Sequence, residues 1–138
     1  MTKRLWLAAA GASVLMPAAA AAQDTITLKF LTGWDGRFEG TRFIAQKYAA
    51  MVEAASKGRI KFRFSGPEVV KPRQQFEPVS TGVFDLFYST PVYYLGTTGV
   101  PMAFYAMPPN TEMWRKRGYW AYTDKEFGRY NQKLIGLF

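Results

Sequence analysis

The sequence predicts an α/β fold in which helices flank a mainly parallel sheet. Three segments are typical of strands, because they alternate polar and apolar residues or are short and apolar: Thr25–Leu31, Arg59–Phe64 and Val83–Tyr88. Two segments between them, Gly40–Ser56 and Arg73–Thr81, carry apolar residues at helical spacing. Strands that alternate with helices form parallel sheets joined by right-handed crossovers. The order of the five segments therefore favours one parallel layer covered by helices.

Glycines mark the ends of both predicted helices. Gly58 follows the first helix and Gly82 follows the second. Glycine readily takes the left-handed conformation in which many helices end. In the first strand, Ile26, Leu28 and Phe30 share one face, which we expect to be the apolar face of the sheet.

The third predicted strand contains a charged residue. Val83–Tyr88 is mostly apolar, as a strand covered on both faces would be, and Asp85 lies inside it. A buried carboxylate needs a partner. We therefore expect Asp85 to cap a turn or a helix within the fold rather than to take part in catalysis.

The remaining chain is less regular. Ser89–Pro109 is rich in proline, glycine and tyrosine. Helices are expected at Thr111–Tyr122, with Thr111 as the cap, and at Asp124–Gln132. Lys133–Phe138 is typical of a further strand.

The N-terminal segment Met1–Ala22 has the three parts of a cleavable secretory signal. Two basic residues precede an uncharged apolar run, and the small residues Ala20-Ala21-Ala22 follow it. A membrane anchor is the alternative, but the run is alanine-rich and broken by Pro17. We expect export to the periplasm, with residues 23–138 as the mature domain.

The composition excludes several kinds of site. The chain has no His and no Cys, which removes disulfides, thiol nucleophiles, Cys/His zinc sites and Ser-His-Asp triads. The carboxylates show neither paired spacing nor a calcium-loop pattern, so no catalytic, metal or cofactor site is expected. The net charge of +8 comes from scattered basic residues. Nucleic acid is therefore not an expected partner, whereas an anionic small ligand is compatible with the charge.

Candidate binding residues follow the predicted strands. The carboxyl ends of parallel strands meet at one edge of a sheet, and binding crevices lie outside that edge. We expect three segments there: Thr32–Arg37, Ser65–Lys71 and Ser89–Gly96. Their aromatic rings would form walls and their hydroxyls would donate hydrogen bonds to a carboxylate. The candidate ligand-binding residues are Trp34, Tyr88, Ser89, Thr90, Tyr93 and Tyr94.

Each candidate has a structural alternative. Trp34 would instead plug a gap against a neighbouring lobe, and Ser89 and Thr90 would cap the loop that follows the third strand. Adjacent side chains point in different directions, so at most one of Tyr93 and Tyr94 should face a ligand while the other packs in the core.

Several motifs also follow one another in an order typical of one protein family. Lys57-Gly58-Arg59-Ile60-Lys61 joins the first helix to the second strand, and Val79–Leu86 joins the second helix to the third strand. Pro91-Val92-Tyr93-Tyr94-Leu95-Gly96 then precedes Pro101. Glu112-Met113-Trp114 and Tyr130-Asn131 come later. With the N-terminal signal, this order resembles the periplasmic solute-binding (DctP-type) subunit of tripartite ATP-independent periplasmic (TRAP) transporters. The motif before Pro101 resembles the subgroup that binds 2-oxo acids and related organic acids.

The resemblance implies a protein without catalytic activity that binds a small organic acid between two lobes and delivers it to membrane permease subunits. Family members are much longer, so residues 23–138 are expected to form a truncated first lobe that lacks the second. The family's carboxylate-anchoring arginine usually lies beyond the position of Phe138. We therefore expect this lobe alone to bind ligand weakly or not at all.

Two other classes of function stay open from the sequence. One is a periplasmic interaction module without a small ligand, which would bind an acidic partner through Arg115–Arg117. The other is an exported enzyme that uses Asp85 or another carboxylate as a base, which requires polar groups to converge on it in a pocket.

Overall fold

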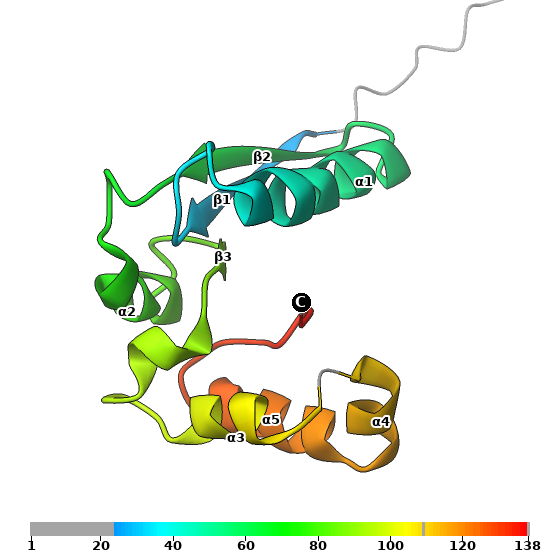
Figure 1. Cartoon of the computed structure of the whole chain (residues 1–138). Coiled ribbons are helices and arrows are strands. Elements are labelled where there is room, and N and C mark those ends of the chain that lie inside the picture. Colours follow the sequence, from blue (N-terminus) through cyan, green and yellow to red (C-terminus); the bar gives the residue numbers. More distant parts are fainter. Residues whose placement is uncertain (1–23, 109, 138) are drawn as a thin grey trace, which may run out of the picture.

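The computed structural model describes residues 24–108 and 110–137 (Figure 1). The expected signal at Met1–Ala22 and the last residue of the expected terminal strand, Phe138, lie outside the described residues. The elements are β1 (Ile26–Thr32), η1 (Thr41–Gln46), α1 (Lys47–Ala55), β2 (Ile60–Ser65), η2 (Pro72–Gln74), α2 (Phe76–Ser80), β3 (Leu86–Tyr88), η3 (Pro91–Tyr94), α3 (Val100–Ala106), α4 (Thr111–Lys116) and α5 (Tyr119–Gly128). No helix in this part of the chain is long and apolar enough to cross a membrane.

The three strands form one parallel sheet in the order β2-β1-β3, which confirms the predicted α/β fold. Figure 1 shows α1 running along one face of this sheet. Phe30 of β1 lies on that face, where its ring stacks on Phe64 at 4.9 Å between centroids and meets Tyr48 of α1 edge-on at 6.5 Å. Of the apolar face predicted for the first strand, Phe30 is buried against the first helix and Leu28 is half-buried, whereas Ile26 at the start of the strand is 46% exposed.

The other face of β1 is covered near its carboxyl end. Leu31 is fully buried there in a cluster with Val79 of α2 and Phe84. Phe87 of β3 packs against this cluster and also against a second one, formed by Phe76, Tyr94, Val100 and Phe127. The second cluster joins α2, η3, α3 and α5, so the helices below the sheet in Figure 1 share a core with its last strand.

Both predicted glycines follow their helices with positive φ, but at the end of α1 the preceding residue, Lys57, is already left-handed with φ of 53°. Gly58 has φ of 79° and Gly82 has φ of 77°, the left-handed conformation that glycine adopts without the steric cost of a side chain. The predicted helices are confirmed in kind, but each is divided. A π-helical turn precedes α1, and a short 3-10 turn that begins at Pro72 precedes α2.

Asp85 differs from its expected environment. It is exposed and precedes β3, which is shorter than the predicted strand and only half-buried. Its carboxylate accepts a hydrogen bond of 2.6 Å from the Lys29 backbone N–H, and its own N–H donates to the Lys29 carbonyl. The expected structural partner is therefore present, but it is the backbone of Lys29 in β1 rather than a turn or a helix.

The helix expected at Thr111–Tyr122 is wrong in its extent. Gly118, with φ of 78°, breaks it into α4 and α5, and α5 ends at Gly128 rather than at Gln132. The cap of α4 is Asn110, not Thr111, because the Asn110 side chain accepts the hydrogen bond from the Met113 N–H. The left-handed conformation of Gly118 thus interrupts the helix, although apolar residues recur at helical spacing on both sides of it.

The expected terminal strand is also wrong, because residues 133–137 form no regular element and pair with no strand in the described structure. Side-chain contacts with α5 and α2 hold this segment in place instead. Leu134 N–H donates to Asp124, and Lys133 forms an ion pair of 2.9 Å with the same carboxylate. The Gln132 amide donates to Phe76 O and to the Ser80 hydroxyl of α2. A strand needs a free neighbouring edge at hydrogen-bonding distance, and the local sequence cannot supply one.

Candidate ligand-binding site

The carboxyl ends of β1 and β3 lie against each other. The Gly33 N–H donates a hydrogen bond of 2.8 Å to the Tyr88 carbonyl, so the loops that follow both strands start side by side. A glycine favours this approach, because a Cβ atom at position 33 would lie 2.9 Å from Ser89 Oγ and would force that side chain to shift. This brings Trp34 together with Ser89 and Thr90, as the topology of a parallel sheet predicts.

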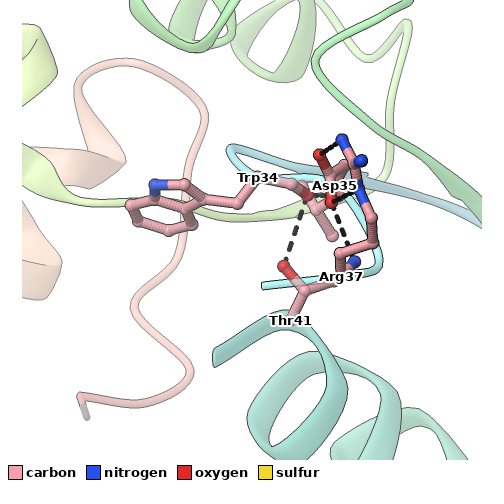
Figure 2. A network of polar contacts seen from close by, with 5 residues as sticks. Trp34, Asp35, Arg37 and Thr41 are labelled. Atoms are coloured by element: carbon pink, nitrogen blue, oxygen red, sulfur yellow. Dashed lines mark hydrogen bonds and ion pairs between the residues drawn. The ribbon is translucent and has the colours of Figure 1, made fainter. Parts of the chain in front are cut away.

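The backbone of the first loop is held by polar contacts (Figure 2). The Trp34 carbonyl accepts hydrogen bonds from the hydroxyls of Thr32 at 2.9 Å and Thr41 at 3.3 Å. Asp35 forms an exposed ion pair of 3.0 Å with Arg37, and the hydrogen bond from that side chain lowers the pKa of Asp35. Figure 2 shows the Trp34 indole projecting away from all these contacts. The loop after β1 is therefore fixed by hydrogen bonds on one side, and the Trp34 indole projects from its other side.

The indole belongs to an aromatic cluster at this edge of the sheet, which we define as Trp34, Phe38, Tyr88 and Tyr93. Trp34 stacks on Phe38 at 5.0 Å and contacts Tyr88 at 5.5 Å and Tyr93 at 6.2 Å between ring centroids. Three of these rings are half-buried, and Phe38 is 46% exposed. Burial raises the pKa of the Tyr88 hydroxyl. The cluster forms a partly open apolar surface that keeps one edge in contact with solvent.

A guanidinium lies beside the aromatic cluster. The Arg73 guanidinium carbon is 5.6 Å from the centroid of the Tyr93 ring, within the range of a cation–π contact. Arg73 is exposed and makes no ion pair within residues 24–108 and 110–137. Arg73 therefore places a positive charge beside the aromatic cluster, and no carboxylate of the described chain neutralises that charge.

The two adjacent tyrosines have different surroundings, as the sequence led us to expect. Tyr93 is half-buried in the aromatic cluster, whereas Tyr94 is 3% exposed in the core with Phe76. Only the Tyr94 hydroxyl reaches the edge, where it lies 2.7 Å from Ser89 Oγ and 3.2 Å from the Pro72 carbonyl. Burial raises the pKa of Tyr94 to about 12. Tyr94 therefore contributes to this edge through Ser89 rather than through its ring.

The two candidate hydroxyls each have an internal partner. Ser89 Oγ accepts from the Tyr94 hydroxyl, and Thr90 Oγ1 lies 2.7 Å from the hydroxyl of Tyr105. A hydroxyl has one donor and two acceptor positions. When Ser89 accepts from Tyr94, its own O–H stays available to donate to a carboxylate.

Besides Arg73, two residues at this edge escaped prediction from the sequence. Phe38 completes the aromatic cluster, and its position four residues after Trp34 is the only hint that the sequence offers. Gln75 is fully buried, and its amide donates to the carbonyls of Thr32 at 2.9 Å and Val70 at 3.0 Å. It ties the end of β1 to the loop that leads away from β2, and no sequence pattern marks it.

The edge thus offers ring surfaces, hydroxyl donors and one guanidinium, groups suited to holding a small anionic ligand with an apolar or planar body. Among the described residues, no three His, Cys, Asp or Glu side chains come together as metal ligands would. The six sequence candidates all lie at this edge or bond to it, with Tyr94 in the core behind it.

The architecture is that of a small parallel α/β layer with a candidate site at its carboxyl edge, which is the class of fold found in solute-binding proteins. In particular, it is similar to a solved TRAP transporter solute binding protein from Bordetella bronchiseptica RB50, with a TM-score of 0.67 at 16% sequence identity. The match covers 78% of this chain and 34% of the other, so this chain spans about a third of that protein's length. That structure is a mixed-occupancy dimer with copurified calcium and picolinate in one active site and an apo site. No family model matches the chain, and no curated protein is similar to it in sequence.

Proposed function

We propose that this chain is part of a periplasmic solute-binding protein of the TRAP type, and that it supplies one wall of a cleft for small organic acids. The observation that carries the proposal is the aromatic cluster at the carboxyl edge of the parallel sheet, with Arg73 beside it. The likeness in fold to a TRAP transporter solute binding protein supports it. Membrane permease subunits would receive the ligand.

In this proposal the ligand lies against the rings of Trp34 and Tyr93. Its carboxylate accepts hydrogen bonds from Ser89 and Thr90, and the nearby positive charge of Arg73 favours the anion. A second lobe would cover the opposite side by hinge closure and exclude water. Because a single wall leaves the ligand largely hydrated, we expect the chain alone to bind in the millimolar range.

Two ligand types fit such a wall. A 2-oxo acid such as pyruvate has a short planar body beside its carboxylate, as the resemblance in the Pro91–Gly96 motif suggests. Picolinate, which the similar structure holds, is a planar aromatic carboxylate and would stack more extensively on Trp34.

The experiment is a titration followed by NMR through the indole N–H signals of the tryptophans, assigned by single Trp→Phe variants. Pyruvate and picolinate should shift the Trp34 signal at about millimolar concentration, whereas Trp114 and Trp120, which lie in the helical layer, should not respond. Pyruvamide and picolinamide, which lack the charge, are the matched control ligands and should shift the Trp34 signal less.

The variant Trp34→Ala should remove the response of neighbouring amides to both acids, while Trp120→Ala should leave it unchanged. If neither acid shifts Trp34 at about 10 mM, or if the shifts map to Trp114 and Trp120 instead, the proposal fails. Micromolar binding would contradict the need for a second lobe.

A further inference from the structure

A hollow of about 500 Å³ lies between α3 and α5, in the helical layer rather than at the sheet edge. Its size lies within the range of small-molecule sites. Residues from both helices and from the turn before α5 line it: Ala103, Ala106, Met107, Arg117, Tyr119 and Tyr122. None of these residues belongs to the aromatic cluster.

The walls of the hollow are mainly apolar. Ala103 and Ala106 are small, so a ligand can approach the α3 backbone closely. Tyr119 and Tyr122 are 37% and 59% exposed, which leaves their rings accessible along the opposite wall. Tyrosine combines a large apolar surface with a hydroxyl, and such residues are favoured in binding sites.

A cationic side chain, Arg117, lies where this hollow meets a neighbouring one. Arg117 lines both this hollow and a neighbouring one of about 560 Å³, which also contains Asn110, Glu112 and Lys116. Its side chain makes no ion pair within the described chain. By contrast, the Arg115 guanidinium lies 3.9 Å from the centre of the Trp120 ring. Arg117 is therefore the arginine of this basic run that lines the apolar hollow, where it can meet the anionic end of a ligand.

We propose that the hollow between α3 and α5 binds a monocarboxylate with an apolar body, with the carboxylate at Arg117 and the body between Ala106 and Tyr122. An apolar wall with a single guanidinium at one end is complementary to a molecule with one anionic end and one hydrophobic end. This site goes beyond the proposed transport function and does not depend on it.

Octanoate is the probe, titrated into the chain and followed by backbone amide NMR. Shifts should concentrate on Ala103, Ala106, Gly118 and Tyr122 and should saturate at about millimolar concentration. Octanamide keeps the apolar body without the charge and should bind more weakly, and acetate keeps the charge without the body and should not bind there.

Three variants separate the contribution of the Arg117 charge to binding from that of the apolar hollow. Arg117→Gln should weaken octanoate binding about fivefold and leave octanamide binding unchanged. Lys116→Gln removes an equal charge from the neighbouring hollow alone and should leave both unchanged. Ala106→Leu should narrow the hollow beside the α3 backbone and weaken the binding of both probes.

Three results would overturn the proposal. The first is no saturable shift at about 10 mM octanoate, and the second is a set of shifts at Trp34 and Ser89 instead. The third is self-association that Ala106→Leu abolishes, which would make a second copy of the chain the occupant of the hollow.

Discussion

The Tyr94 hydroxyl lies 2.7 Å from Ser89 Oγ, so a ring buried in the core holds a side chain at the carboxyl edge of the sheet. The Pro72 carbonyl is also within 3.2 Å of this hydroxyl. One phenol thus connects η3 to the loop after β3 and to the start of η2. Tyr94 therefore contributes both to the packing of the core and to the position of Ser89 in the candidate site.

Replacing Tyr94 by Phe should destabilise the fold by about 1 kcal/mol, because the ring is kept while the hydrogen bond of 2.7 Å from its hydroxyl to Ser89 Oγ is lost. Urea denaturation followed by circular dichroism measures the change. Tyr122→Phe is the control, since that tyrosine is 59% exposed, and it should have little effect. Equal stability of Tyr94→Phe and the original chain would show that the hydroxyl makes no net contribution.

The same tyrosine should make stability depend on alkaline pH. In the unfolded chain Tyr94 ionises near its ordinary pKa of 10.0, but in the folded chain burial raises the pKa to about 12. The unfolded state therefore loses this proton first as pH rises, and about 3 kcal/mol of stability is lost between pH 10 and 12. Other tyrosines titrate in the same window, so the measurement is the difference in unfolding free energy between the original chain and Tyr94→Phe. A difference that does not change with pH across this window would contradict the prediction.

The approach of Gly33 to Ser89 should be visible in a pair of substitutions. Gly33→Ala places a Cβ atom 2.9 Å from Ser89 Oγ and should cost about 1 kcal/mol, because the serine must move away from Tyr94. Removing the oxygen in the double variant Gly33→Ala/Ser89→Ala should recover part of this loss, since the Ser89 Cβ lies at an ordinary 3.5 Å. Additive effects of the two substitutions in thermal denaturation would exclude the clash as the cause.

Gln75 offers a test of the link between β1 and the loop after β2. Gln75→Leu should destabilise the fold by about 2 kcal/mol, because the buried Thr32 carbonyl and the partly buried Val70 carbonyl both lose their donor. The neighbouring Gln74 is exposed, so Gln74→Leu is a matched control that should change stability little. Denaturant midpoints compare the two, and similar midpoints would mean that the buried amide has no special role.

Much of the fold was predictable because its signals are local. Alternation identified β1 and β2, helical spacing identified the region of α1, and the glycines at 58 and 82 end their helices as expected. The edge of the sheet that carries the candidate site followed from the order of strands and helices. Prediction failed where another factor overrode the local pattern. Gly118 divides a helix that apolar spacing alone would continue. Residues 133–137 have strand-like alternation, but no strand lies beside them in the described structure.

The sequence by itself determined the fold class, the loops at the carboxyl edge of the sheet, and the choice that only one of two adjacent tyrosines could face outward. Only the tertiary structure decided that Tyr94 is the buried one, that Phe38 completes the aromatic cluster, and that Arg73 lies over Tyr93. It also decided that Asp85 bonds to the edge of β1. These relationships join segments far apart in the chain, and their distances depend on how loops pack, which no periodicity within one segment encodes.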